Sequence, residues 1–341
     1  MPASDAAELR RALAWGVELP EPVTVRSGLL FGKVPGPVVA AIGAFDGVHR
    51  GHRELLARAR EDARRRGLPL VAVTFDPDPS AVLGESAQPA LLSRDDRLRM
   101  VWSVGLDGLL VCDFTPETAA LDYREFMVGL QGVTDLASIH VGEDFCLGAR
   151  GLGTVGRLSA WGAQEGVDVF GHRLLALDGS PVSATRIRRD LERGDVQEAR
   201  RLLARYHFSH GTVVHGRGEG ASFGFPTANV ACPAGSVAPA SGVYGGYAVV
   251  NGLAWPAAVN AGFPPTFAAK GPEAAGPFLE CALVGFSGDL YGADVDVVLT
   301  DELRPSRKFT DVGDLRSVVL GNIEQVRRRL GDEAVRLDEA R

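Results

Sequence analysis

The chain of 341 residues has no long apolar run and few cysteines. No stretch reaches the roughly 18 uninterrupted apolar residues that a transmembrane helix needs, and the N-terminus lacks the apolar core of a signal peptide. The four cysteines form no CxxC pair, which argues against a zinc knuckle or a redox motif. We therefore expect a soluble, reduced, cytoplasmic protein with no membrane partner.

The sequence also lacks an excess of positive charge. Its 36 lysines and arginines stand against 43 acidic residues, which leaves a net charge of −7. Nucleic-acid-binding proteins usually carry a basic surplus, so we expect no nucleic-acid partner. The GxxxxGK[ST] pattern of a P-loop and the HExxH pattern of a helical zinc site are both absent. Phosphate chemistry, if present, must use another kind of site.

The first half of the chain alternates short apolar runs with segments of helical periodicity. The apolar runs predict strands at 38–45, 70–75, 108–114, 137–142 and 166–169. Apolar residues at helical spacing predict helices at 53–66, 95–104 and 123–130. Strands that alternate with helices indicate a doubly wound parallel sheet, that is, an α/β domain.

The pattern changes in the second half. A helix is expected over 182–203, broken at Gly194, and is followed by strand candidates at 212–215, 243–250, 254–260, 278–284 and 294–300. Evenly spaced short strands favour a small closed β-barrel, and a helix over 312–330 would cover it. We expect one domain over 1–185, a helical linker over 186–207 and a second domain over 208–341.

A strand–turn–helix junction carries the segment GAFDGVHRGH at 43–52. A helix N-terminus offers free N–H groups and partial positive charge to an anion. His49 and His52, three residues apart, are placed to face the same phosphates, and Gly51 allows close backbone approach. In the alternative interpretation, one histidine caps the turn and the other packs.

A second glycine-rich segment opens the second domain. Gly216, Gly218 and Gly220 form a loop whose N–H groups suit phosphates, and GFPTAN follows at 224–229. A bare PTAN is also compatible with a simple proline-initiated turn. A GxGxxG match at 151–156 lies outside the first strand–helix unit, so we interpret it as a loop near the nucleotide and not as a dinucleotide fingerprint.

The first junction resembles the HxGH signature of nucleotidylyl transferases, and more specifically the N-terminal module of bacterial bifunctional riboflavin kinases/FMN adenylyltransferases (FAD synthetases). Matching segments follow in order: TFDPDP at 74–79, VGEDFCLGARGLG at 141–153 and VSATRIRRDLERGD at 182–195. The resemblance implies that His49 and His52 are catalytic. It implies ATP binding by Gly43, Phe45, Asp46, Gly51, Ser183, Thr185 and Arg186, and flavin binding by Asp144 and Phe145.

The C-terminal part resembles the riboflavin kinase barrel of the same family. The matching segments are SGVYGGYAVV at 241–250, VNAGFPPTF at 259–267, LECALVGFSGDLYG at 279–292 and LRPSRKF at 303–309. The resemblance implies that Glu280 is the catalytic base and that Thr227 and Asn229 bind Mg²⁺. It also implies ATP binding by Gly216, Gly218, Gly220 and Pro226, and flavin binding by Arg304, Lys308 and Phe309.

The residues alone leave non-functional interpretations open for three of these positions. Glu280 could be a solvent-facing strand residue, although an acid in an apolar strand is costly unless it is used or paired. Arg304 and Lys308 could simply be surface charges.

The resemblance implies that riboflavin and ATP give FMN, and that FMN and a second ATP give FAD and pyrophosphate, with Mg²⁺ as cofactor. Two positions depart from the family pattern. Asp78 stands where a histidine is common, and Ala184 where a second serine is common. The alternatives are a divergent paralogue with one active module or an altered substrate, and a non-catalytic flavin-binding protein.

Overall fold

The computed structural model describes residues 2–21, 23–26, 29–30, 36–83, 88–215, 227–262, 276–307, 309 and 312–338. They form two compact units. The α/β unit comprises residues 17–88 and 94–183. The barrel unit comprises residues 1–16, 89–93 and 184–341.

The α/β unit is built on one sheet with strand order β2-β1-β5-β4-β3-β6-β9, parallel throughout except for β2. Its elements in chain order are β1 (Val23–Arg26), β2 (Leu29–Leu30), β3 (Val38–Ile42), a 3-10 turn (Asp46–Val48), α2 (Arg50–Arg66), β4 (Leu70–Asp76), α3 (Pro79–Leu83), α4 (Arg94–Trp102), β5 (Gly108–Asp113), α5 (Pro116–Ala120), α6 (Tyr123–Val133), β6 (Leu136–Gly142), β7 (Cys146–Leu147), a 3-10 turn (Ala149–Gly151), β8 (Gly153–Thr154), α7 (Val155–Glu165), β9 (Asp168–His172), β10 (Ala176–Leu177) and β11 (Ser180–Pro181).

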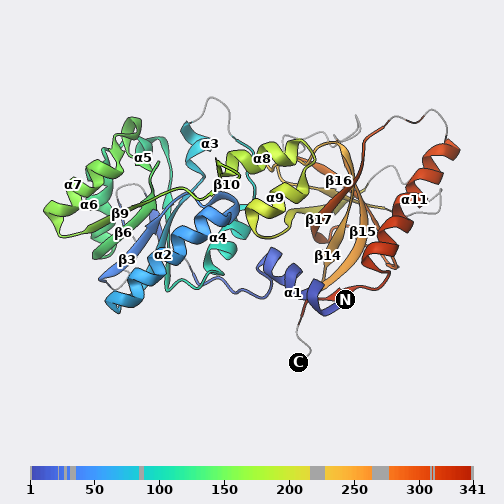
Figure 1. Cartoon of the computed structure of the whole chain (residues 1–341), viewed down its shortest axis with the longest axis horizontal. Coiled ribbons are helices and arrows are strands. Elements are labelled where there is room, and N and C mark those ends of the chain that lie inside the picture. The colour runs from blue at the N-terminus through green and yellow to red at the C-terminus, as the bar shows by residue number, and fades with distance from the viewer. Residues whose placement is uncertain are drawn as a thin grey trace. The chain divides into compact units, whose positions relative to one another are not determined.

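Strand β3 is apolar at every position because helices cover both faces of the sheet. Alternate strand residues point to opposite faces. Val38, Ala40 and Ile42 join a buried cluster with side chains of α6 and α7, so Val39 and Ala41 lie on the side of α2. Helix α2 buries Leu56, Ala59 and Ala63 at helical spacing. The predicted doubly wound parallel sheet is confirmed (Figure 1).

The strand order places the carboxyl ends of β3 and β6 next to each other. The chain moves outward from β3 through β4 to β5 on one side, and from β6 to β9 on the other. In open parallel sheets, ligands bind in the crevice outside the carboxyl ends at such a reversal of strand order. The segment with His49 and His52 follows β3 directly, so topology alone brings it to this crevice.

The barrel unit is an antiparallel sheet in the order β14-β17-β12-β13-β16-β15, closed by pairing between β14 and β15, with β18 added at β15. Its elements are α1 (Pro2–Leu13), α8 (Ala184–Glu192), α9 (Val196–Leu203), β12 (His207–Val214), β13 (Ala228–Ala231), β14 (Gly242–Val250), β15 (Leu253–Gly262), β16 (Phe278–Leu283), β17 (Asp294–Pro305), α11 (Val312–Leu330) and β18 (Val335–Arg336).

The predicted closed barrel with a terminal helix is confirmed. Helix α11 runs along the outside of the barrel strands (Figure 1), and Val326 packs with Ala258 and Ala282 in a buried cluster. Closure requires a bulge between β14 and β17 at Gly246, where an added Cβ would lie 1.9 Å from the carbonyl oxygen of Val298. Only glycine fits there.

One helix was not predicted from the sequence, and one local prediction is wrong. The polar N-terminal residues form α1, which packs in the barrel unit through Glu8 with Arg200 and through Arg10 with the Leu337 carbonyl. The helix expected over 182–203 with a break at Gly194 is present as α8 and α9, which lie on either side of Gly194.

The GxGxxG match at 151–156 does not form the predicted loop, since it contains β8 and the start of α7. Gly153 is needed there for packing, because an added Cβ would lie 2.5 Å from the Cβ of Tyr123. The domain boundaries stay a prediction. By contacts, α8 and α9 belong with the barrel unit.

Candidate functional site

The turn after β3 holds an unusual backbone conformation. Phe45 and Val48 have positive φ angles of 55° and 40°, and Gly47 between them has 72°. The left-handed region costs a non-glycine residue about 1 kcal/mol or more, and most for a β-branched one such as Val48. Strain of this kind clusters at functional sites. The turn is fixed from outside by Thr74, whose hydroxyl donates to the Ala44 carbonyl at 3.1 Å.

His49 and His52 are brought together at the start of α2. Their rings stack with centroids 3.7 Å apart and planes inclined by 16°. His49 caps the helix, because its Nδ1 accepts from the His52 backbone N–H at 3.4 Å. Phe45 packs its ring against His52 edge to face, at 5.3 Å between centroids. At Gly51 an added Cβ would lie 3.2 Å from the His49 ring, so this position must stay small.

Burial keeps both rings neutral. It lowers the pKa of His49 to about 4 and lowers the pKa of His52 well below its usual value, with a smaller contribution from His49. A neutral imidazole that accepts at Nδ1 carries its proton on Nε2. His49 is therefore a hydrogen-bond donor through Nε2 and not a cation.

The capping-and-packing alternative from the sequence agrees with much of this geometry. One atom does not fit it. Nδ1 of His52 is buried and has no hydrogen-bond partner within the described residues. Buried polar atoms are almost always paired, so an orphaned one calls for an explanation. A ligand at the helix N-terminus would supply the missing partner.

Other predicted residues lie around the same edge of the sheet. Asp46 is buried in the 3-10 turn, and Gly43 has the Phe45 ring within 3.3 Å of an added Cβ. Asp144 and Phe145 follow β6, the neighbour of β3 at the reversal of strand order. Asp144 is exposed, whereas Phe145 packs against the core of the sheet.

Asp78, where the resemblance led us to expect a histidine, has structural partners. Its carboxylate accepts from the backbone N–H of Ser80 at 2.9 Å and from the Ser80 hydroxyl at 2.8 Å. It also lies 3.7 Å from the guanidinium of Arg97, which is 6% exposed. Arg97 donates to the Phe75 carbonyl at 2.7 Å and to that of Ala44 at 3.4 Å. Asp78 therefore lies beside a buried cation that also donates to the turn after β3.

The segment VSATRIRRDLERGD at 182–195 is divided between the two units. Ser183 ends the α/β unit, and Thr185 and Arg186 open α8 in the barrel unit. The backbone carbonyl of Val182, the residue before Ser183, lies close to Gly51. A Cβ added at Gly51 would be 3.5 Å from that carbonyl oxygen. Arg186 pairs with Glu198 of α9 at 2.7 Å. The triphosphate roles of these three residues stay a prediction.

In the barrel unit, strand register aligns polar side chains. Glu280 of β16 pairs with Asn229 of β13 on one side and with Asn260 of β15 on the other. Register partners in antiparallel strands point to the same face. Leu279 and Cys281, which flank Glu280, are fully buried on the opposite face. Alternation along β16 therefore directs Glu280 away from the core.

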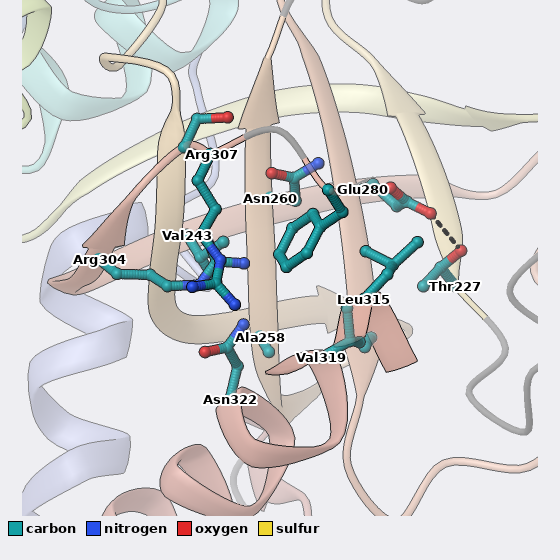
Figure 2. Close-up of a pocket in the computed structure, with 13 residues that line it drawn as sticks. Thr227, Val243, Ala258, Asn260, Glu280, Arg304, Arg307, Leu315, Val319 and Asn322 are labelled. Atoms are coloured by element: carbon teal, nitrogen blue, oxygen red, sulfur yellow. Dashed lines mark hydrogen bonds between the residues drawn. The ribbon is translucent and has the colours of Figure 1, made fainter. Parts of the chain in front are cut away.

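Thr227 completes this row two residues before Asn229. Its hydroxyl donates to Oε1 of Glu280 at 2.9 Å, as the dashed line in Figure 2 marks. Glu280 is half-buried and paired, so the alternative of an unengaged solvent-facing strand acid does not fit. Hydroxyl, amide and carboxylate oxygens gathered in one row are the hard ligands that Mg²⁺ prefers.

A cavity of about 280 Å³ opens beside this row. The lining is mixed, with polar groups at its ends and aliphatic side chains between them (Figure 2). The lining residues are Thr227, Val243, Ala258, Asn260, Glu280, Ala282, Arg304, Ser306, Arg307, Phe309, Leu315, Val319 and Asn322.

Arg304 and Phe309, predicted to bind flavin, both line this cavity. The Cζ atom of Arg307 lies 4.6 Å from the Phe309 ring centroid, and that of Arg304 lies 5.7 Å from it. Burial, and secondarily Arg307, lowers the pKa of Arg304. Arg304 is thus not a simple surface charge. Outside the described residues lie Gly216, Gly218, Gly220, Pro226 and Lys308.

The sequence analysis missed several cavity residues. Asn260 lies in the matched segment 259–267, but only strand register shows that it adjoins Glu280. Asn322 lies on the apolar face of α11 together with Leu315 and Val319. Helical spacing in the sequence could have shown this amide among apolar residues. Arg307 gave no signal apart from its charge.

Comparisons with known proteins divide the chain in the same way. Residues 32–186 match the family model of FAD synthetase, and residues 203–330 match that of riboflavin kinase. The bifunctional riboflavin kinase/FMN adenylyltransferase of Bacillus subtilis is 34% identical over 283 residues, which cover 81% of this chain and 87% of the relative. The enzyme of the same name from Pseudomonas fluorescens is 34% identical over 291 residues, which cover 85% of this chain and 92% of the relative.

The fold has a close match among solved structures. A crystal structure described as a macrolide-efflux protein from Streptococcus pneumoniae has a TM-score of 0.77 and 27% identity, and covers 89% of this chain and 99% of its own. The similarity extends over both units. Within the described residues, no helix combines the length and apolarity needed to cross a bilayer.

Proposed function

The chain belongs to the family of bifunctional riboflavin kinases/FMN adenylyltransferases, and from this premise we propose how its two units divide the work. The barrel unit phosphorylates riboflavin with ATP to give FMN. The α/β unit joins FMN to the adenylyl group of a second ATP, giving FAD and pyrophosphate. Riboflavin, FMN and ATP are the small-molecule substrates.

The kinase step rests on one observation, the Thr227–Glu280 hydrogen bond at the rim of the cavity. Glu280 accepts the proton of the riboflavin 5′-hydroxyl while that oxygen attacks the γ-phosphorus of ATP and ADP leaves. Thr227 orients the carboxylate by donating to Oε1. The aliphatic walls of the cavity hold the flavin ring and exclude water from the reacting end.

The metal belongs to this proposal as well. Thr227 and Asn229 would hold Mg²⁺ through their hydroxyl and amide oxygens, next to Glu280 in the row of side chains. When bound, the ion would neutralise the phosphates of ATP. Among the described residues no cluster of three or more histidine, cysteine or acidic side chains offers a competing metal site.

The adenylyl step needs donors and positioning, and no base. The FMN phosphate is already an anionic nucleophile that attacks the α-phosphorus of ATP as pyrophosphate leaves. His49 and His52, neutral and stacked at the N-terminus of α2, donate N–H groups to the phosphate oxygens.

We also propose a reducing, cytoplasmic location, because all four cysteines are free thiols.

Incubation of the purified protein with riboflavin, ATP and Mg²⁺, followed by separation of the flavins, tests the proposal. We expect FMN to appear first and FAD to follow. Accumulation of FMN without FAD would instead favour a divergent paralogue that has lost the adenylyl step. Flavin retention without ATP turnover would indicate a non-catalytic flavin-binding protein.

A further inference from the structure

A row of polar side chains crosses the face of the sheet that α2 covers. Ile139 of β6 joins the apolar cluster on the other face, so alternation places its neighbours Ser138 and His140 towards α2. Ser138, His140 and Asp62 of α2 are each at most 2% exposed. Apolar side chains could fill this space without the cost of burying polar groups. The polar row therefore needs an explanation beyond packing.

The hydrogen bonds along this row have a defined direction. Asp62 accepts from the Ser138 hydroxyl at 2.7 Å and from Nε of Arg66 at 2.9 Å. Burial alone would raise the pKa of Asp62, but these bonds and a third from His140 lower it to about 2. Because a carboxylate only accepts, Nε2 of His140, 3.2 Å from Asp62, carries a proton. Burial lowers the pKa of His140 and keeps the ring neutral, so its Nδ1 accepts from Nε2 of His172 at 2.8 Å.

The row ends beside the residues predicted to bind flavin in the α/β unit. His172 is the last residue of β9, the edge strand next to β6 (Figure 1). Its backbone carbonyl accepts from the Glu143 N–H at 2.8 Å, and the Glu143 carboxylate accepts from the Leu174 N–H at 3.0 Å. Asp144 and Phe145 follow Glu143 directly. Two hydrogen bonds thus attach the chain after β6 to the chain at the end of β9.

The turn over 142–145 is itself closely folded. The Phe145 N–H donates to the Gly142 carbonyl at 3.0 Å. Asp144 folds back over Gly142, where an added Cβ would lie 2.8 Å from Oδ1 of Asp144. The turn lies at the carboxyl end of β6, next to β3, where the strand order reverses. A shift of the end of β9 would therefore move this turn within the crevice.

We propose that His140 and His172 are positioning residues for the adenylyl step, and that with Glu143 they hold the turn over 142–145 in the conformation that receives the flavin of FMN. The proposal rests on the adenylyl function proposed above. Both ring nitrogens of His140 bond within the protein, so this ring is not itself a ligand for the substrate. Hydrogen bonds add orientation to the packing here, because they are directional and apolar contacts are not.

The test compares His172→Leu with His172→Gln in FAD synthesis from added FMN and ATP. Leucine removes the donor to His140, whereas the terminal amide of glutamine replaces it. His172→Leu should raise KM for FMN about three- to tenfold, with kcat and KM for ATP little changed. His172→Gln should stay within about twofold of the wild type. A merely structural role would lower the midpoint of thermal unfolding without separating the two KM values.

Asp168→Asn is the matched control, since Asp168 lies at the other end of β9, where it pairs with Arg66 at 2.7 Å. It should leave KM for FMN unchanged. Glu143→Ala changes an exposed side chain, so it should fold normally and raise KM for FMN in the same range as His172→Leu. The proposal is overturned if neither His172→Leu nor Glu143→Ala exceeds the control, if the two KM values rise together, or if glutamine fails to restore KM for FMN.

Hydrogen exchange tests the same turn independently of catalysis. Saturating FMN should slow exchange at the backbone N–H groups of Glu143 and Leu174 in the wild type, and should do so much less in His172→Leu. Equal slowing in both proteins would overturn the proposal. If the wild type makes no FAD from FMN and ATP, the adenylyl function fails while the exchange rates still test the turn.

Discussion

The two sites reach phosphate chemistry by different structural means. In the α/β unit, the strand order places the site, because a strained turn and a helix N-terminus lie at the carboxyl ends of β3 and β6. In the barrel unit, strand register places the site, because pairing across β13, β16 and β15 aligns Asn229, Glu280 and Asn260. The first site offers backbone N–H groups and neutral rings, and the second offers a carboxylate beside a cavity. One suits a reaction without a base, and the other suits a reaction that needs one.

The largest expected effect separates the two sites by chemistry. Glu280→Gln removes the base but keeps the shape of the side chain, so FMN formation should fall by about 10²–10⁴-fold. FAD formation from added FMN should be unchanged. Separation of the flavins after each incubation measures both activities.

Glu302→Gln, at an exposed position on β17, is the control and should affect neither activity. If Glu280→Gln abolishes both activities in a protein that is still folded, the division of labour is wrong.

A second change tests the support that Arg97 gives to Asp78 and to the turn after β3. Arg97→Met leaves Asp76 and Asp78 without their buried cation and removes donors from the Phe75 and Ala44 carbonyls. A buried carbonyl that loses its donor costs about 1–3 kcal/mol of unfolding free energy, so the variant should be destabilised by at least that much. Urea unfolding measures the loss, and hydrogen exchange should place it in the α/β unit.

Arg94→Met is the matched comparison, since Arg94 also pairs with Asp76, at 2.7 Å, but is 47% exposed. Its cost should be below about 1 kcal/mol. Equal costs for the two variants would show that Arg97 is not the support of this turn.

The third change acts on the histidine pair. His49→Asn keeps a helix cap but removes the imidazole N–H, so FAD synthesis from FMN should fall by about 10²-fold. FMN synthesis should persist. His210→Ala, at a histidine paired with Asp296 in the barrel unit, should leave FAD synthesis intact. Unchanged FAD output from His49→Asn would remove His49 from the mechanism.

The smallest effect is a difference in acid sensitivity between the units. Burial lowers the pKa of four histidines in the α/β unit: His49 to about 4, His52, His140, and His172 to about 4. The ordinary pKa of histidine is 6.5. Below that pH, the histidines of the unfolded chain therefore bind more protons than those of the folded chain. Stability should be full above pH 6.5 and fall as the pH drops towards about 4.

In the barrel unit, burial lowers the pKa of His207 to about 3. Hydrogen exchange at pH 7 and pH 5 should show a larger loss of protection in the α/β unit. A barrel unit that opens first on acidification would contradict this prediction.

Sequence patterns predicted the elements that rest on local apolar periodicity. Strands β3 to β6 were predicted because helices on both faces make them apolar throughout, and α11 because its apolar face recurs at helical spacing. Strand β13 was missed because Ala228–Ala231 is short and its pattern weak. Helix α1 was missed because Leu9 and Leu13 are its only large aliphatic side chains and its contacts are with residues far along the chain.

For the candidate sites too, the sequence predicted residues within continuous motifs but not those contributed by distant elements. His49, His52, Thr227 and Glu280 lie in continuous motifs, so the sequence predicted them together. The residues that adjoin Asp78 and Glu280 come from other elements, because Arg97 lies on α4 and Asn260 on β15. Asn322 reaches the cavity from α11. Such tertiary pairings leave no local periodicity in a single sequence.

The central claim is that one chain carries two separable activities that share FMN. The direct measurement mixes the Glu280→Gln and His49→Asn proteins with riboflavin, ATP and Mg²⁺ and separates the flavins. Alone, the first should leave riboflavin unconverted and the second should stop largely at FMN. Together they should form FAD, because FMN released by the second protein is the substrate of the first. A mixture that still stops at FMN would contradict the account.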